Sequence, residues 1–195
     1  MAKEGHSSLK ALMGAIPAAA KNPPPVDSWD PPYCGDIDMR IAADGTWYYQ
    51  KSPIRRPALV KLFASLLKRE GDRYFLVTPA EKCGIIVDDA PFLAVDMRVE
   101  DSDHGKALRF FTNVGDEVLG GPDHALRFER QADTGGLVPY LHVRRGLWAK
   151  LTRALFHDLV DLGEERVVDG VRMFGVASRG VFFPMAPADR LEGIA

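Results

Sequence analysis

The sequence predicts an α+β fold with mainly antiparallel sheets, in which a hairpin–helix–hairpin unit occurs twice in tandem. Two observations predict the duplication. The stretch that begins at Arg55-Arg56 returns at Arg144-Arg145, with lysine and leucine at matching positions of the helix expected after each arginine pair. The flanks agree, because a glycine followed by three apolar residues comes later in both copies, at 84–87 and 180–183. Two copies of one unit share an interface, and ligands tend to bind at interfaces.

The composition is typical of a folded protein without affinity for polyanions. The 195 residues hold 25 Lys and Arg against 27 Asp and Glu, a formal net charge of −2. This balance argues against nucleic acid as a partner, which needs a broad basic field. No apolar run reaches the roughly 18 to 20 residues that cross a bilayer, so no membrane association is expected. The two cysteines form no framework, which fits a reducing compartment, and we expect a cytoplasmic protein.

Residues 1–31 are expected to form an N-terminal helix and a proline-rich connector. The helix is expected in the short apolar stretch Lys10–Ala20. A signal peptide is the alternative for this stretch, but Glu4 and Pro17 fit it poorly. Five prolines between residues 21 and 32 indicate an extended segment that leads into the folded part of the chain.

The first repeat unit is predicted at 32–91. Alternating residues on both sides of Asp44-Gly45 are a strong hairpin signal. The expected hairpins are 36–41 with 46–50, and 73–78 with 84–87.

A helix is expected between these two hairpins. Pro57 suits its first position, where the missing N–H is no loss. Apolar residues spaced by three and four then form one stripe that includes Leu66 and Leu67, so the helix is expected to end near Glu70-Gly71.

The second and larger repeat unit is predicted at 92–190. Its expected elements are strands 92–99 and 106–112, the hairpin 126–130 with 137–143, a helix Leu147–Leu162, and the hairpin 171–176 with 180–183. The first two strands have no counterpart in the first unit, so they are expected to enlarge the second sheet.

The chain carries no standard catalytic signature. Phosphate-binding glycine loops, nucleophile elbows and the helical zinc motif are all absent. The five histidines are scattered without metal-ligand spacing. No catalytic residue, metal site or cofactor is therefore assigned. Carboxylates such as Glu81 and Asp116 leave a metal-dependent hydrolase as a minor alternative.

The two arginine pairs, Arg55-Arg56 and Arg144-Arg145, are the main candidates for ligand binding. A guanidinium is always charged, and its planar fork matches a phosphate or a carboxylate. The start of a helix adds free N–H donors. The alternative is that these arginines are solvated or brace the partner unit through carboxylates, since a brace would be duplicated as readily as a binding group.

Further side chains are expected to complete the lining of the ligand site. Thr78 and Lys82 flank the polar stretch T-P-A-E-K, Asn113 lies in T-N-V-G-D, and His142 ends a strand. Trp47 or Tyr49 could stack on a base. Loops that close a hairpin explain both polar stretches without a ligand, so this alternative stays open.

The chain resembles a known family from about Tyr33 to Met185. The motifs C-G-D-I-D-M-R-I-A-A-D-G-T-W-Y-Y, L-V-T-P-A-E-K-C-G-I-I-V-D-D-A-P-F, T-N-V-G-D and G-P-D-H-A-L-R-F are together similar to those of the bacterial domain-of-unknown-function family numbered 1285. The resemblance implies a duplicated α+β core, a C-terminal half superficially like a pleckstrin-homology fold, and a ligand site between the halves for a nucleotide-type molecule in signalling. It brings no catalytic residues.

The residues and the resemblance together predict a ligand-binding protein, a signalling sensor for a nucleotide-like or other anionic small molecule held between the two repeat units. The first alternative is a non-enzymatic scaffold that binds a protein partner and uses the arginines as internal braces. The second is the metal-dependent hydrolase.

Overall fold

The computed structural model describes residues 24–132 and 134–190, so the helix predicted within Lys10–Ala20 lies outside the described residues. The chain divides into two compact units, with the boundary between Pro91 and Phe92. Strands make up 54% of the described residues, and two α-helices accompany them there. The fold is therefore predominantly β, and the predicted α+β repeat of hairpin–helix–hairpin units is wrong.

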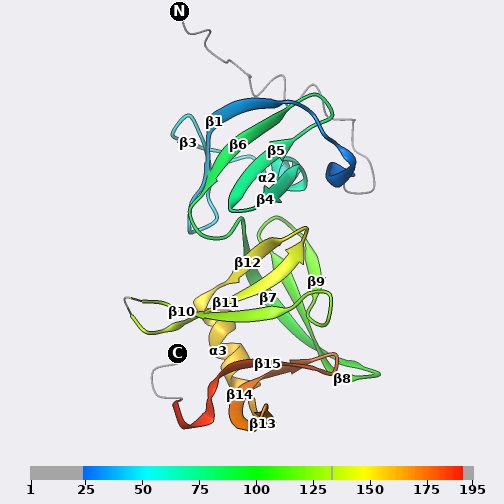
Figure 1. Ribbon diagram of the computed structural model, residues 1–195, viewed down its shortest axis with the longest axis vertical. Helices are drawn as coiled ribbons and strands as arrows, with labels where there is room; N and C mark the ends of the chain where they lie inside the picture. Colours follow the sequence, from blue (N-terminus) through cyan, green and yellow to red (C-terminus); the bar gives the residue numbers. More distant parts are fainter. Residues whose placement is uncertain (1–23, 133, 191–195) are drawn as a thin grey trace, which may run out of the picture. The chain divides into compact units, whose positions relative to one another are not determined.

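Unit 1 contains one six-stranded sheet, sheet A, with the strand order β3-β2-β1-β6-β5-β4 (Figure 1). Its elements are η1 (Val26–Ser28), β1 (Tyr33–Ile41), β2 (Trp47–Tyr49), β3 (Ser52–Pro53), α2 (Pro57–Ser65), β4 (Leu67–Glu70), β5 (Arg73–Val77) and β6 (Lys82–Val87). All neighbours are antiparallel except β1 and β6, which run parallel. Sheet A is thus two three-stranded meanders joined by one parallel pair.

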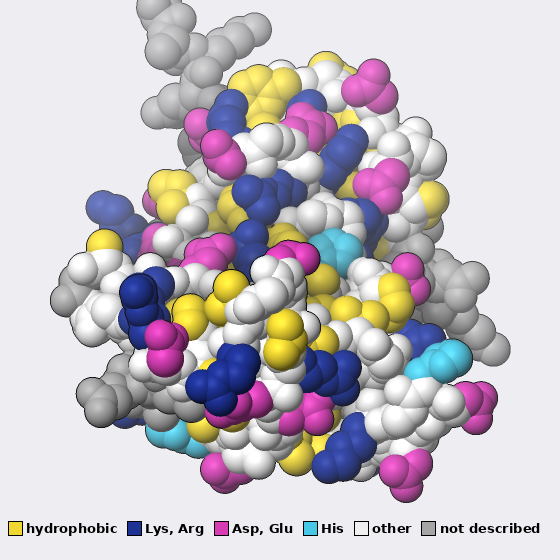
Figure 2. Space-filling model, turned by 60° about the horizontal axis from the view of Figure 1, so that its bottom comes forward, with side chains coloured by type: hydrophobic (Ala, Val, Ile, Leu, Met, Phe, Trp, Pro, Cys, Tyr) yellow, Lys and Arg dark blue, Asp and Glu magenta, His cyan; other side chains and the backbone are white. Residues whose placement is uncertain are grey.

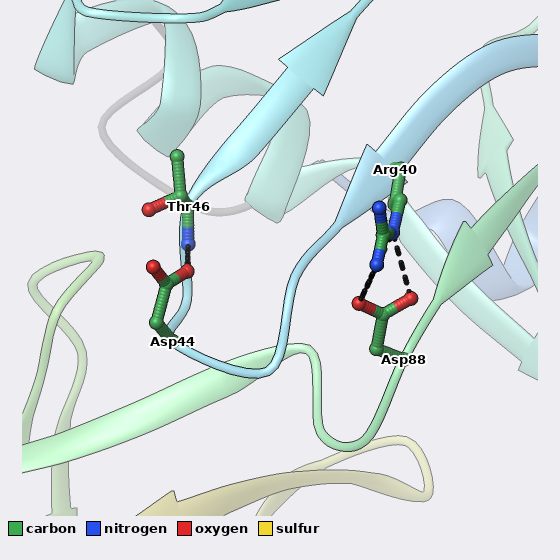
Figure 3. Close-up of polar contacts among 4 residues, drawn as sticks. All are labelled: Arg40, Asp44, Thr46 and Asp88. Atoms are coloured by element: carbon green, nitrogen blue, oxygen red, sulfur yellow. Dashed lines mark hydrogen bonds and ion pairs between the residues drawn. The ribbon is translucent and has the colours of Figure 1, made fainter. Parts of the chain in front are cut away.

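The hairpin predicted at Asp44-Gly45 is confirmed, because β1 and β2 pair antiparallel with Ile41 opposite Trp47. The backbone N–H of Thr46 donates to the Asp44 carboxylate at 2.9 Å, which closes the turn (Figure 3). This hydrogen bond holds the pKa of Asp44 below its ordinary value. The second predicted hairpin of unit 1 is also confirmed, as β5 and β6.

Helix α2 begins at Pro57 as predicted but ends earlier, at Ser65. The next residues form β4, which pairs with β5 so that Leu67 lies opposite Leu76. Both Leu66 and Leu67 are buried. Their spacing fits the apolar stripe of a helix as well as it fits a strand. Leu66 is the C-cap of α2, and the strand begins at Leu67 because this residue pairs with Leu76 of β5.

The proline-rich connector packs onto sheet A. Val26 of η1 is fully buried and contacts Phe75 and Val77 of β5, and Trp29 packs against this cluster. Burial of these apolar side chains attaches the connector to unit 1.

An ion pair ties β1 to the segment after β6. Nε and Nη2 of Arg40 donate to the Asp88 carboxylate at 2.8 and 2.5 Å (Figure 3). These hydrogen bonds, followed by the charge of Arg40, lower the pKa of Asp88. The Asp88 carboxylate, directly after β6, is therefore held by Arg40 of β1.

Unit 2 contains two sheets (Figure 1). Sheet B has the order β10-β11-β12-β7-β8-β9, and sheet C has the order β13-β14-β15. The elements are β7 (Phe92–Ser102), β8 (Gly105–Thr112), β9 (Glu117–Leu119), β10 (Leu126–Arg130), β11 (Leu137–Arg144), β12 (Leu147–Leu151), α3 (Arg153–Asp161), β13 (Glu164–Val168), β14 (Val171–Ser178), β15 (Val181–Pro187) and η2 (Ala188–Arg190). In the described residues, no helix is long and apolar enough to cross a membrane.

Sheets A and B have the same topology. In each sheet the first and sixth strands in chain order run parallel at the centre, and the remaining neighbours run antiparallel. The repeat therefore matches β1–β6 with β7–β12. The helices are not part of it, because α2 connects the third strand to the fourth, whereas α3 follows the sixth.

The helix predicted at Leu147–Leu162 is wrong in its first part. Residues 147–151 form β12, and helix α3 covers only Arg153–Asp161. Burial alternates along β12, with Leu147, Ala149 and Leu151 buried and the two residues between them half-buried. Thr152 is the N-cap of α3, and its side chain accepts a hydrogen bond from the N–H of Leu155.

The topology forces sheet B to curl. A flat six-stranded sheet would hold its edge strands, here β9 and β10, about 24 Å apart. The segment that joins them, 120–125, contains a tight turn in which Gly121 and His124 exchange backbone hydrogen bonds of 3.1 and 3.2 Å. A connection folded back on itself cannot span a flat sheet. This explains why the structure includes a curled half-barrel.

Sheet C is fastened to sheet B by a fully buried serine. Ser178 at the end of β14 donates to the Gly120 carbonyl oxygen at 2.7 Å and accepts from the N–H of Leu108 at 2.9 Å. Because both partners belong to the β8–β9 side of sheet B, the β14–β15 turn has a defined position on that sheet.

We expect Gly175→Ala to destabilise unit 2 by about 1 to 3 kcal/mol. A Cβ at Gly175 would overlap the carbonyl oxygen of Phe183 and approach Cα of Pro184 to 2.9 Å, and both are backbone atoms of β15. Gly84→Ala is the matched control, because its Cβ would displace only the end of the exposed Asp36 side chain from its pair with Arg73. Urea unfolding of both variants measures the difference, and equal losses would contradict the prediction.

We expect Asp88→Asn to make the stability of unit 1 less sensitive to acid. Because the pKa of Asp88 is lowered in the folded protein, its pair with Arg40 stabilises the fold above about pH 4, the ordinary carboxyl range. That contribution is lost as the pH falls through the lowered pKa. The urea midpoints of variant and wild type should therefore differ at pH 7, and the difference should shrink as the pH falls below about 4.

The control for this pH dependence is Asp72→Asn, since the Asp72 side chain is fully exposed. A difference between Asp88→Asn and wild type that stayed constant down to pH 3 would contradict the role given to the pair.

Candidate functional site

The predicted ligand residues of unit 1 lie in three places. Arg55 and Arg56 are exposed just before α2, and Arg56 is the N-cap residue, in an extended conformation and without a side-chain cap. Trp47 is 1% exposed and its ring stacks on Phe63 at 6.3 Å, so it is a core residue. Tyr49 is half-buried at the end of β2, opposite Ser52 of β3.

Thr78 and Lys82 flank the loop between β5 and β6. The fully buried Thr78 hydroxyl accepts from the N–H groups of Ala80 and Glu81, at 3.3 and 3.2 Å, and thus closes the loop. Nζ of Lys82 pairs with Glu70 at 2.9 Å, and this hydrogen bond lowers the pKa of Glu70. Both side chains therefore have structural partners within unit 1.

The predicted residues of unit 2 gather at one end of sheet B. Asn113 holds the start of β7, because its Oδ1 accepts from the N–H of Leu93 at 3.0 Å and its own N–H donates to the Leu93 carbonyl at 2.9 Å. Arg144 ends β11, and Arg145 follows in the turn to β12 with a left-handed φ of 48°. A strand, not a helix, comes after this second arginine pair, so it does not correspond to Arg55-Arg56.

Arg144 acts as a brace within unit 2. Its Nη1 pairs with the Asp116 carboxylate at 2.5 Å, and its guanidinium lies 4.8 Å from the ring centroid of Phe92. These contacts join the end of β11 to the β8–β9 loop and to the start of β7. The side chains of Arg144 and Asp116 are only 22% and 30% exposed, so solvent screens this pair less than a surface pair.

The hydrogen bonds of His142 define its tautomer. Nε2 accepts from the N–H of Gly146 at 3.3 Å, so Nδ1 carries the proton and donates to the Asp123 carbonyl at 3.0 Å. The ring stacks with His124 at 6.0 Å and meets Trp148 edge-on at 5.2 Å. His142 therefore supports the β11–β12 turn that carries the arginine pair.

A cation sits between two aromatic rings next to this histidine. The Arg127 guanidinium lies 4.1 Å from the ring centroid of Trp148 and 5.1 Å from that of Tyr140. Sequence reasoning missed this group. Arg127 lies opposite Tyr140 when β10 and β11 are paired in the observed register. The contact can be predicted only when this register is known.

A cavity of unit 2 lies beside α3 and has a volume of about 440 Å³. Two cationic side chains line it, Lys150 of β12 and Arg153 at the start of α3. Gln131 and Thr134 of the β10–β11 loop also line it, and its apolar wall comes from Leu137, Pro139, Leu151 and Phe156. None of its described lining residues is acidic.

None of the ten residues predicted to bind a ligand lines this cavity. The sequence analysis predicts a helix over residues 147–151, and it therefore does not predict that Lys150 of β12 lines a cavity. The usable signal was the alternation of Leu147, Ala149 and Leu151, followed by Thr152 as a helix cap.

The carboxylates proposed for the hydrolase have other surroundings. The Asp116 carboxylate is paired with Arg144 in unit 2, whereas Glu81 lies in the β5–β6 loop of unit 1. Across residues 24–132 and 134–190, no group of three or more His, Cys, Asp and Glu residues has the arrangement of a metal site.

The two units correspond to two family models. The model described as the N-terminal domain of DUF1285, a domain of unknown function, matches residues 24–90, and the model of the C-terminal domain matches residues 91–185. The chain belongs to the DUF1285 family. The resemblance inferred from the motifs is thereby confirmed.

Two solved DUF1285 structures are similar to this chain. A DUF1285 family protein from Silicibacter pomeroyi DSS-3 is 50% identical, with a TM-score of 0.83, over 93% of this chain and 97% of that chain. A DUF1285 family protein from Shewanella baltica OS155 is 34% identical, with a TM-score of 0.51, over 64% of this chain and 91% of that chain. No curated protein matches the chain.

We expect a double-mutant cycle on Arg144→Met and Asp116→Asn to give a coupling energy of about 1 to 2 kcal/mol in urea unfolding. The pair is short and mostly shielded from solvent. The matched control is Arg172→Met with Glu165→Gln, an exposed pair at 3.4 Å, which should couple by less than about 0.5 kcal/mol. Equal coupling in the two cycles would contradict the role of Arg144 as a brace.

Proposed function

We propose that this protein is a non-enzymatic binding protein for a nucleotide-like or other anionic small molecule, and that the cavity beside α3 in unit 2 holds this ligand. The observation that carries the proposal is the combination of volume and charge. At about 440 Å³ the cavity lies in the range of small-molecule sites. Among its ten described lining residues, two are cationic and none is anionic.

The cations suit a phosphate or carboxylate group. Lys150 and Arg153 are separated by Leu151 and the N-cap residue Thr152, so one short segment carries both charges into the cavity. Charge-assisted hydrogen bonds from an ammonium and a guanidinium are stronger than those between neutral groups. Gln131 and Thr134 add neutral polar groups for orientation.

The apolar wall suits the rest of a nucleotide-like molecule. Pro139, Leu137 and Leu151 present flat or branched apolar surface, and Phe156 of α3 adds an aromatic ring. A base or another flat ring would be removed from water on this wall while the anionic group meets the cations. The described lining holds no His, Cys, Asp or Glu that could act as a nucleophile or general base, which favours binding over turnover.

A signalling role and a cytoplasmic location complete the proposal. A sensor needs a ligand site and a surface that reports occupancy, and the two-domain architecture of the DUF1285 family offers separate units for the two tasks. The ligand site that the sequence predicts between the two units stays a prediction.

A protein-interaction scaffold is the second candidate. It is favoured by two exposed apolar side chains on the β13–β14 hairpin, since Val167 is 69% exposed and Val171 is 49% exposed. The two side chains lie on opposite faces of the hairpin, because Val167 is opposite Arg172 and Val171 is opposite Val168, so each face of this hairpin would offer one apolar contact to a protein partner.

We expect Lys150→Met and Arg153→Gln each to weaken nucleotide binding about tenfold or more, because each removes one charge-assisted hydrogen bond. The measurement is a thermal-shift screen of nucleoside mono-, di- and triphosphates, followed by calorimetric titration of the best one. A nucleotide at 100 times its Kd should stabilise the wild type by about 2.7 kcal/mol.

Arg172→Gln is the matched control for these variants, because Arg172 is an exposed cation of unit 2 outside the cavity. If no nucleotide stabilises the wild type, or if all three variants bind it equally, the cavity beside α3 is not the site.

A further inference from the structure

A second cavity of unit 2, with a volume of about 270 Å³, lies where sheet C meets the tip of the β7–β8 hairpin. Its described lining includes three basic side chains, namely His104 and Lys106 of the hairpin and Arg166 of β13. One acidic side chain, Glu164, also lines it. Cations therefore outnumber carboxylates in this cavity even when the histidine is neutral.

Backbone contacts hold the two sides of this cavity together. The N–H of Arg179 donates to the Lys106 carbonyl at 2.8 Å, which joins the β14–β15 turn to the start of β8. A Cβ built at Gly180 would lie only 3.5 Å from Cβ of His104, so this turn and the hairpin tip approach closely. The buried Ser178 fixes the same turn to Gly120. The backbone segments that carry His104 and Lys106 are thus held in place before any ligand arrives.

The side chain of Arg166 is oriented on the opposite side of the cavity. It pairs with Glu164 at 2.5 Å, and its guanidinium lies 5.2 Å from the ring centroid of Phe182. Of the five donors of a guanidinium, the Glu164 pair occupies the Nη2 end. Arg166 therefore offers further donors at a defined place, while Glu164 reduces the local positive charge.

The positive charge here belongs to the cavity and not to a broad surface. Figure 2 turns the end of unit 2 that carries sheet C to the front, where Lys and Arg side chains lie beside Asp and Glu with hydrophobic side chains between them. Such a mixed surface gives no long-range attraction of one sign. An anion would therefore be recognised by groups that converge at short range.

We propose that this cavity is a binding site for a small tetrahedral dianion, a sulfate or a phosphate group, separate from the cavity beside α3. The volume limits the ligand, and only Leu162 and Ala177 contribute apolar side chains to the lining. A large apolar ring finds no matching wall. Lys106, Arg166 and His104 supply the N–H donors from two sides.

Sulfate is the best probe, because it is a tetrahedral dianion with no apolar part. We expect calorimetric titration at low ionic strength to show that the wild type binds sulfate. The charged groups that face His104 are Lys106 from β8 and Glu164 and Arg166 from β13. The imidazole of His104 adds an N–H donor on the hairpin side of the cavity.

The exposed residues His104 and Lys106 are the first to test, because their replacement should not disturb folding. Lys106→Met should weaken sulfate binding about five- to tenfold. His104→Gln should weaken it less, because the glutamine amide keeps an N–H donor. Glu164→Gln should bind sulfate more tightly than the wild type, because a repelling carboxylate is gone. Arg172→Gln is the control and should leave sulfate binding unchanged, because Arg172 is an exposed cation outside both cavities.

The outcomes separate this site from the proposed nucleotide site. Weaker sulfate binding in Lys106→Met with unchanged binding in Arg172→Gln supports the proposal, whether or not any nucleotide binds beside α3. Sulfate affinity that is equal in wild type, His104→Gln and Lys106→Met overturns it.

Discussion

Each six-stranded sheet of this protein depends on one parallel strand pair at its centre. In sheet A the pair is β1 with β6, and in sheet B it is β7 with β12. Every other neighbour in both sheets belongs to an antiparallel meander, which short turns can build locally. Only the parallel pair joins the first strand of each six-stranded sheet to the sixth, so without it each sheet would be two separate meanders.

The parallel pair also dictates how the chain must cross each sheet. It places the third and fourth strands at opposite edges, so the connection between them has to pass from one edge to the other. Unit 1 makes this crossing with β3, α2 and the start of β4, and the helix packs its buried Phe63 against Trp47. Unit 2 has only the folded-back segment 120–125, and its sheet curls to bring the edges together.

The different use of the helix in the two units determines where a ligand could bind. Because α3 is not needed as a crossing, it follows β12 directly and leads into sheet C. Its first turn then brings Arg153 beside Lys150, next to the β10–β11 loop, and forms the larger cavity of unit 2. The added sheet C forms the smaller basic cavity against the β7–β8 hairpin. Arg144, in contrast, is occupied in holding three segments of sheet B together.

The sequence by itself determined the local structure of this protein and its family. Hairpins at Asp44-Gly45 and at 126–143, and the helix start at Pro57, follow from alternation, turn residues and proline chemistry, which act over a few neighbours. The two six-stranded sheets share a topology, but the sequence match between Arg55-Arg56 and Arg144-Arg145 joins elements that do not correspond, so the predicted repeat was wrong. Leu66 and Leu67 fit a helix as well as a strand, and residues 147–151 were counted as helix although they alternate.

Only the tertiary structure decided which strands pair and which polar groups meet. The parallel pairs join residues far apart in sequence, and no local pattern encodes their register. For the same reason the sequence could not show that Arg144 meets Asp116 and Phe92, that Trp47 lies in the core, or that Lys150 and Arg153 line one cavity. Side-chain type is local information, whereas its surroundings depend on strand order.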